Sequence, residues 1–323
     1  MADIRDRETA SPLQELETHA HLLAARIPSL LVEAQRVSHT VTHGIHGRRR
    51  AGPGETFWQF RHFENSDSAG NIDWRRSASS DHLYVREREW EAAHTAWLWA
   101  DISASMQFQS HLSSTTKAER AIVLALAMGE LLVRGGERIG LLGERPRTGR
   151  TAVRKLAESI SRRLGEDNET ESLPPAAAVG RFSECILFSD FLEPLEVLAP
   201  RLERLAVQGV RGYLVQILDP AEETLPYSGR TEFIASEGGE QMIAGRAETL
   251  RERYSDRLTA HRQALTEELR RLEWSMLLHH TDRPAEEVLL ALHARLAGLE
   301  HDYRYRPSGD KPGFAVAGEE TSG

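Results

Sequence analysis

Acidic and hydroxyl side chains follow two apolar runs in this chain, and their types suit metal binding. Asp101, Ser103 and Ser105 come directly after one run, and Asp190 comes after another. Carboxylate and hydroxyl oxygens are hard ligands, and Mg²⁺ prefers octahedral oxygen coordination with one or two carboxylates. In the spacing Asp-x-Ser-x-Ser, a chain that leaves a strand can turn alternate side chains toward one point. The sequence therefore predicts a site for Mg²⁺ or Mn²⁺.

A purely structural interpretation of the same serines is also open. In that interpretation Ser103 and Ser105 cap turns that lead into the next helix, as serine hydroxyls do in many loops. The second carboxylate, Asp190, stands at the end of a different apolar run. Because two carboxylates, Asp101 and Asp190, each follow an apolar run, metal binding is favoured over capping.

The pattern from residue 94 onward predicts strands and helices that alternate. Continuous apolar strands of this kind are typical of a mostly parallel sheet with helices on both faces. In such sheets, binding sites form at the carboxyl ends of the strands. We predict strands at 95–102, 138–142, 184–188, 212–218 and 274–279, a hairpin at 231–235 and 241–244, and helices at 116–134, 152–164, 194–208, 246–271 and 284–297.

The first ninety residues have a different character. Apolar residues at helical spacing predict one or two helices over 11–43, with a break at Pro28. Short aromatic and β-branched runs then predict short strands near 57–60, 72–74 and 83–87. We therefore divide the chain into an N-terminal accessory region at 1–90, an α/β domain at 91–303 and a disordered tail at 304–323.

Composition excludes several classes of function. The formal charge of −9 argues against a nucleic-acid-binding surface. The longest apolar stretch, 121–133, contains Glu130 and is shorter than the roughly 20 residues of a membrane span. The chain has one cysteine, Cys185, and no signal-peptide pattern, so we expect a cytoplasmic protein. It has neither a phosphate-binding Gly-rich loop with lysine nor a nucleophile motif, which predicts that it is not an enzyme.

Two resemblances to known families rest on these motifs. Asp101-x-Ser103-x-Ser105-Met106 resembles the metal-ion-dependent adhesion motif (MIDAS) of von Willebrand factor A domains. A more specific resemblance, over about residues 40–300, is to the bacterial "domain of unknown function 58" family. It rests on several motifs that occur in order, namely Phe57-Trp58-Gln59-Phe60-Arg61, Asn71-Ile72-Asp73-Trp74-Arg75-Arg76-Ser77-Ala78, Leu83-Tyr84-Val85-Arg86-Glu87 and His279-His280-Thr281-Asp282-Arg283-Pro284.

The resemblances imply a fold, a ligand set and a partner. The fold is von Willebrand factor A-like, in which Ser103 and Ser105 bind the metal through their hydroxyls. Asp101 and Asp190 bind it directly or through water, and a threonine from a middle loop completes the set. Thr151 is the candidate for that threonine, with Thr148 second, although the stretch 143–151 is short for the edge strand that usually precedes it. The family is typically encoded beside a MoxR-type AAA+ ATPase, which is the expected partner.

These expectations favour a non-enzymatic protein-binding module, in which a carboxylate from another protein fills an open position on the metal. Two alternatives stay open. One is a metal-dependent hydrolase that uses Asp101 and Asp190 with His62 or His111 as the base. The other is a structural adaptor whose metal site is inactive.

Overall fold

A computed structural model of the chain describes most of the predicted α/β region and parts of the N-terminal region. The predicted tail at 304–323 and the predicted strand near 72–74 lie outside the described residues. The described residues are 12–46, 59–62, 77–78, 83–87, 94–149, 151–164, 171–234 and 241–296.

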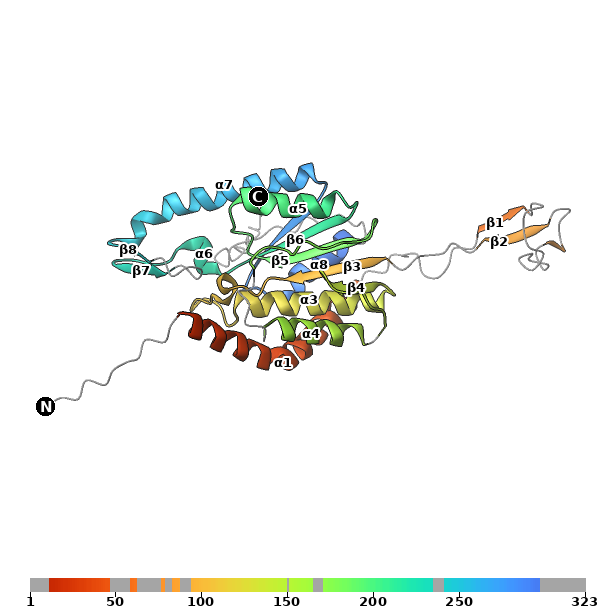
Figure 1. Ribbon diagram of the computed structural model, residues 1–323, viewed down its shortest axis with the longest axis horizontal. Helices are drawn as coiled ribbons and strands as arrows, with labels where there is room; N and C mark the ends of the chain where they lie inside the picture. The colour runs from red at the N-terminus through yellow and green to blue at the C-terminus, as the bar shows by residue number, and fades with distance from the viewer. Residues whose placement is uncertain are drawn as a thin grey trace, which may run out of the picture.

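A five-stranded sheet forms the centre of the fold, and all of its neighbouring strands run parallel (Figure 1). Its strand order is β4-β3-β5-β6-β9. The central strand β5 and its neighbour β3 are each buried along all but the first residue, which explains their continuous apolar sequences. The predicted mostly parallel sheet is therefore confirmed. The strands are β3 (Thr95–Ala100), β4 (Arg138–Leu141), β5 (Glu184–Ser189), β6 (Arg211–Leu218) and β9 (Ser275–His280).

Helices cover both faces of the sheet, as predicted. On one face, apolar side chains of four helices pack with Leu98, Ile186 and Val215 of the strands. On the other face, two helices pack with Trp97, Leu187 and their neighbours (Figure 1). The first group is α1 (Pro12–His46), α3 (Lys117–Arg134), α4 (Ala152–Leu164) and α8 (Ala285–Leu296), and the second is α5 (Leu195–Ala206) and α7 (Arg251–Arg271). Among the described helices, none has the length and apolar character to cross a membrane.

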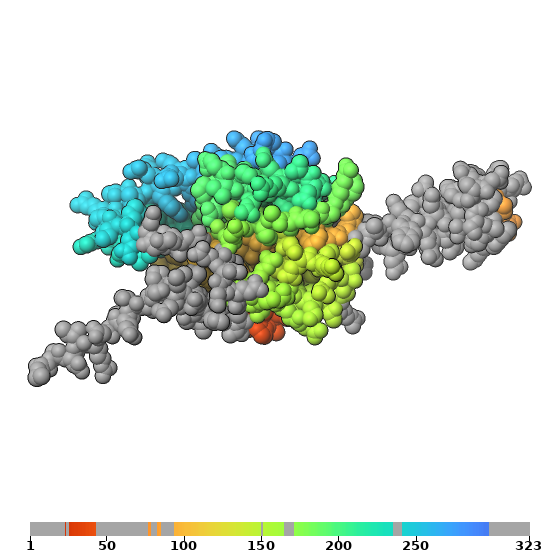
Figure 2. Space-filling view, viewed as in Figure 1, coloured from red at the N-terminus to blue at the C-terminus, as the bar shows by residue number. Residues whose placement is uncertain are grey.

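Smaller elements complete the described part of the chain. Two antiparallel strand pairs are separate from the main sheet, and the second of them matches the predicted hairpin. That second pair and the start of α7, coloured cyan, lie at one end of the coloured part of the chain (Figure 2). The elements are β1 (Gln59–His62) with β2 (Tyr84–Glu87), β7 (Thr231–Ile234) with β8 (Gln241–Ala244), the short helix α6 (Pro220–Thr224), and the 3₁₀ turns η2 (Ala104–Gln107) and η3 (Ala247–Leu250).

The strand order places a topological switch point between β3 and β5. The chain leaves β3 through α3 toward β4 at one edge, and it leaves β5 through α5 toward β6 and β9 on the other side. Loops that diverge in this way open a crevice at the carboxyl ends of the two strands. The residues that follow β3 and β5 therefore meet at the position where open α/β sheets bind their ligands.

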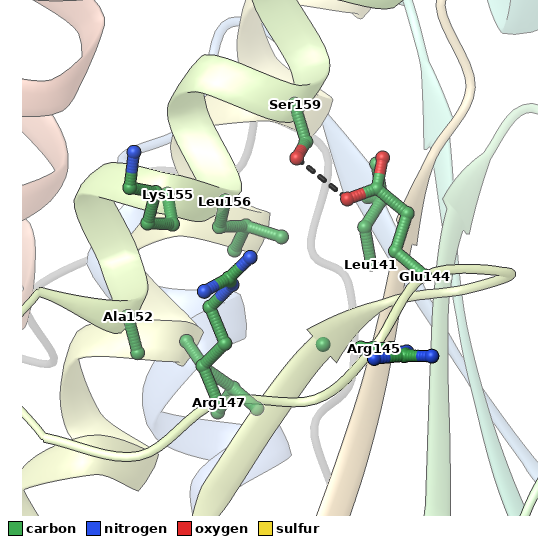
Figure 3. A pocket seen from close by; sticks show the side chains of 10 residues that line it. Leu141, Glu144, Arg145, Arg147, Ala152, Lys155, Leu156 and Ser159 are labelled. Carbon is green, nitrogen blue, oxygen red and sulfur yellow. Dashed lines mark hydrogen bonds between the residues drawn. The ribbon is translucent and has the colours of Figure 1, made fainter.

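The chain that follows the edge strand β4 does not enter the next helix directly. After β4 the chain turns at Gly143, whose φ is 90°. It then runs back antiparallel to β4, with two backbone hydrogen bonds between Ile139 and Arg147 of 2.7 and 2.9 Å. The chain thus returns toward the amino end of the strands before α4 begins. Figure 3 shows the consequence, because Ala152 lies beside Arg147 while Ser159, further along α4, bonds Glu144 beyond the carboxyl end of β4.

The long N-terminal helix corrects one expectation. The predicted break at Pro28 is wrong, since α1 is continuous across it. Pro28 lies on the exposed side of the helix, so its ring displaces no packed neighbour. A proline inside a helix costs about 3 kcal/mol, and burial of the opposite face against α3, α4 and α8 outweighs that cost. The buried residues of this face are Leu23, Ile27, Leu30, Ala34, Val37 and Val41.

Burial of this face predicts the effect of removing one side chain from it. Leu30 is 2% exposed, so Leu30→Ala should lower the free energy of unfolding by about 2–4 kcal/mol through lost burial and a cavity. Urea denaturation followed by circular dichroism measures this change. Val32 lies on the same helix and is 66% exposed, so Val32→Ala is the control and should change stability by less than about 0.5 kcal/mol. Equal effects of the two substitutions would contradict the packing of α1 described here.

Candidate metal centre at the carboxyl end of the sheet

Asp101 is the first residue after β3 and is almost completely buried, with 1% of its surface exposed. Its backbone N–H donates to Phe188 O of β5 at 2.9 Å, which extends the sheet by one residue. Its carboxylate accepts hydrogen bonds from Ser103 N at 2.9 Å and from Ser189 Oγ at 2.6 Å. The carboxylate is thus fixed in place at the junction of β3 and β5.

Ser103 and Ser105 lie in the turn that follows Asp101. Ser103 is buried and Ser105 is partly exposed, and their hydroxyl oxygens are 3.2 Å apart. Ser103 precedes the 3₁₀ turn η2, yet its side chain makes no capping hydrogen bond there. The capping interpretation of Ser103 therefore has no support in the structure. The two hydroxyls instead face each other beside the buried carboxylate.

Asp190 is the first residue after β5 and is also buried. Its charge is close enough to Asp101 to raise the pKa of that carboxyl group. One carboxylate oxygen of Asp190 accepts from Leu192 N at 3.2 Å, and the other accepts from the ammonium group of Lys117 at 2.8 Å. The structure therefore brings together four of the five predicted site residues, and it gives Asp190 a cationic partner that the sequence did not suggest.

Lys117 belongs to a network of buried polar groups at this end of the sheet. It is the first residue of α3 and is only 1% exposed. Its ammonium also donates to Glu222 Oε1 of α6 at 2.6 Å. Glu222 Oε2 in turn accepts from Asp219 N at 2.8 Å, and Asp219 accepts from both the backbone and the hydroxyl of Ser110. The only sequence signal for Lys117 was its rarity, as one of three lysines in a chain with 40 basic residues.

Negative charge exceeds positive charge in this cluster. Asp101, Asp190, Asp219 and Glu222 supply four carboxylates, and Lys117 supplies one ammonium. Burial opposes the charge on Lys117, but the carboxylates of Asp190 and Glu222 outweigh burial and raise its pKa, so it stays protonated. Burial, and to a smaller extent the charge of Asp190, raises the pKa of Asp101 to about 7. Among the described residues, no hydrogen bond or ion pair joins Asp101 to a cation, in contrast to Asp190.

The structure does not bring Thr151 to the centre. Thr151 precedes α4, and Arg163 near the end of that helix donates to Leu142 O just after β4 at 2.9 Å. Because a helix rises about 1.5 Å per residue, Thr151 lies on the order of 18 Å from that end of the sheet. Thr148 lies in the same returning segment, beside Arg147. The returning segment carries both threonines toward the amino ends of the strands, away from Asp101.

The donor set suits a small hard cation. Two ligands at adjacent positions of an octahedral Mg²⁺ site are about 3.0 Å apart, since each lies at about 2.1 Å from the metal. The hydroxyl oxygens of Ser103 and Ser105 are separated by 3.2 Å, which fits such a pair. Among the described residues, no group of three or more His, Cys, Asp or Glu side chains is arranged to hold a metal. The candidate ligands that the structure brings together here are therefore hydroxyls as well as carboxylates, namely Asp101, Ser103, Ser105 and Asp190.

The fold and this centre define an α/β protein with a polar site at its switch point. The chain belongs to the family described as "Protein of unknown function DUF58", which matches residues 59–264. The predicted membership of this family is confirmed.

Curated relatives are similar over most of their length. The uncharacterized protein Rv1480 of Mycobacterium tuberculosis is 27% identical over 289 residues, which is 81% of this chain and 86% of that protein. The uncharacterized protein Mb1516 of Mycobacterium bovis shows the same identity and coverage.

Two solved structures show weak similarity. BatB from Bacteroides thetaiotaomicron, a conserved hypothetical protein, is 14% identical with a TM-score of 0.34, over 64% of this chain and 100% of its own. An uncharacterized membrane spanning protein from Vibrio fischeri is 17% identical with a TM-score of 0.15, over 64% of this chain and 98% of its own. Neither similarity bears on the fold.

The raised pKa of Asp101 predicts how stability depends on pH. An aspartate in the unfolded chain has a pKa of about 3.9, whereas burial raises that of Asp101 to about 7. Between these values the folded state binds more protons, so this group makes the protein less stable as pH rises from about 4 to 7. The loss is at most about 1.4 kcal/mol per pH unit, and it levels off above about pH 7.

Urea denaturation of the wild type and of Asp101→Asn in metal-free buffer isolates this effect. The wild type should lose stability relative to the variant as pH rises through that window, because asparagine does not titrate. A difference between the two proteins that is constant from pH 4 to 8 would contradict the burial of a titrating Asp101.

Proposed function

We propose that this chain is a non-enzymatic protein-binding module with a divalent cation, Mg²⁺ or Mn²⁺, at the carboxyl end of its sheet. The ligands are Asp101, Ser103 and Ser105, in the manner of a von Willebrand factor A domain. One observation carries the proposal. The hydroxyls of Ser103 and Ser105 are 3.2 Å apart beside a buried carboxylate that has no cationic partner among the described residues.

One side of the proposed metal site is exposed to solvent, which supports contact between the metal and a partner protein. Asp101 and Ser103 are buried, but Ala104 and Ser105 of the η2 turn are partly exposed. A cation held at this point has protein ligands on its inner side and solvent on the side of η2. A carboxylate from another protein can then replace a water on the cation. The metal supplies a positive charge at the surface that recognises that acidic group.

The proposed partner is an AAA+ ATPase of the MoxR type, in the cytoplasm. This part of the proposal rests on the motif resemblance, which covers about residues 40–300, and on membership of the DUF58 family. In this role the chain is an adaptor that links the ATPase to an acidic protein segment.

The hydrolase alternative finds less support in the geometry. It needs a general base within hydrogen-bond reach of the water that it activates. His111 is exposed in the loop after η2, and the described residues show no hydrogen bond from it to either Asp101 or Asp190. The side chain of His62 lies outside the described residues.

Thermal unfolding with and without Mg²⁺ tests the metal. At a concentration of about ten times its dissociation constant, a bound cation stabilises the folded state by roughly 1.4 kcal/mol. In a domain of this size that raises Tm by about 3–6 °C. Ser103→Ala removes one ligand and should abolish the rise. Ser161→Ala should keep it, because Ser161 belongs to α4, which contributes no described side chain to the centre. A wild-type Tm that changes with neither Mg²⁺ nor Mn²⁺ would contradict the proposed metal site.

Affinity capture with a purified MoxR-type ATPase tests the partner. Capture should require Mg²⁺, should weaken at least tenfold in Ser103→Ala, and should be unchanged in Ser161→Ala. Capture that is equally strong in a chelating buffer would mean that the interface does not use the metal.

An activity assay tests the hydrolase alternative. The purified chain should show no turnover of ATP, phosphodiesters or peptides. Robust turnover that disappears in Asp101→Asn would favour the hydrolase.

A further inference from the structure

The ion pair between Lys117 and Asp190 is buried, and both side chains make further hydrogen bonds. The ammonium donates to Asp190 Oδ2 at 2.8 Å and to Glu222 Oε1 at 2.6 Å, and Lys117 is 1% exposed. The other oxygen of each carboxylate is occupied as well, by Leu192 N at 3.2 Å and by Asp219 N at 2.8 Å. Breaking one contact leaves a buried charge without a partner, which is strongly destabilising. Asp190 is thus held in one orientation by groups of this chain alone.

Asp101 and Asp190 therefore differ in their electrostatic surroundings. Asp190 already has a cation at hydrogen-bond distance, whereas the hydrogen bonds that Asp101 accepts come from a backbone N–H and from serine hydroxyls. A divalent cation bound directly to Asp190 would lie within a few ångströms of the Lys117 ammonium. Like charges at that separation repel strongly in a buried site. Direct coordination is therefore far more favourable at Asp101 than at Asp190.

We propose that Lys117 is a built-in cation that holds Asp190 out of direct coordination and thereby sets the affinity of the centre for divalent cations. The inference rests on the proposed metal function, and Lys117 acts in it as a positioning residue. With Lys117 in place, the metal binds to Asp101, Ser103 and Ser105 and remains weakly held. A weakly held metal keeps positions open to water and to a partner's carboxylate.

A merely structural role for Lys117 makes a different prediction. If the ammonium only neutralises two buried carboxylates, its loss changes stability and leaves metal affinity unaltered. The double substitution Lys117→Met with Glu222→Gln separates these roles. It removes one positive and one negative charge, so the total charge of the cluster is the same as in the wild type. It also releases Asp190 from its cationic partner.

The experiment is a Mg²⁺ titration of the wild type and of this double variant, followed by thermal unfolding and by isothermal titration calorimetry. The double variant should bind Mg²⁺ at least about tenfold more tightly, because Asp190 becomes free to coordinate. Glu222→Gln alone is the matched control. It keeps Lys117 on Asp190 and removes one negative charge, so it should bind Mg²⁺ no more tightly than the wild type.

Asp190→Asn gives a second measurement that does not depend on the folding of the double variant. Asp190→Asn removes one negative charge near Asp101, as Glu222→Gln does, so the two single variants are compared with each other. If Lys117 keeps Asp190 out of direct coordination, Asp190→Asn weakens Mg²⁺ binding to within about threefold of Glu222→Gln. A loss that exceeds that of Glu222→Gln by tenfold or more would mean that Asp190 coordinates the metal directly, and would overturn the inference.

The remaining outcomes distinguish this inference from the proposed function. If the wild type binds Mg²⁺ and the double variant binds it equally or more weakly, the role of Lys117 is overturned while the metal function stands. If only the double variant binds Mg²⁺, the role of Lys117 is supported and the metal function of the natural chain fails. If neither protein binds Mg²⁺, both are overturned.

Discussion

Burial of several carboxylates at one end of a parallel sheet is the constraint on which the rest of this structure depends. Removing an ionised carboxylate from water costs several kcal/mol unless a cation or hydrogen-bond donors replace the lost hydration. Asp190 and Glu222 share Lys117, and Asp219 accepts hydrogen bonds from Ser110. Asp101 accepts hydrogen bonds but has no cationic partner within the described part of the chain. These contacts join the loops after β3, β5 and β6, so the polar centre forms as one unit.

The shape of the sheet explains why the polar groups gather where they do. Parallel strands end at a common edge, and helices on both faces leave that edge as the place where loops meet. The antiparallel return through Arg147 breaks this pattern on one side, because it brings α4 back to the amino end of the strands. The centre is therefore built from the β3, β5 and β6 loops and the start of α3. The chain between β4 and β5 contributes no described side chain to it.

Much of the fold could be predicted from local sequence. The strand and helix ranges from residue 94 onward agree closely with the structure, because strands such as β3 are apolar throughout and α3 begins with a capping box at Thr116 and Glu119. The break at Pro28 was wrong because the penalty of a proline is local, whereas its compensation comes from α3, α4 and α8, which are distant in sequence. Membership of the DUF58 family also followed from ordered motifs.

The sequence by itself determined which residues follow each strand, and hence that Asp101, Ser103, Ser105 and Asp190 share one edge of a parallel sheet. Side-chain type and strand periodicity are local properties, and they were sufficient for that. Only the tertiary structure decided that Lys117 neutralises Asp190 and that Thr151 lies toward the amino ends of the strands. The first depends on a contact between residues 73 positions apart, and the second on the direction of a short returning segment. Neither leaves a periodic signal in the sequence, because burial and pairing at long range are properties of the assembled fold.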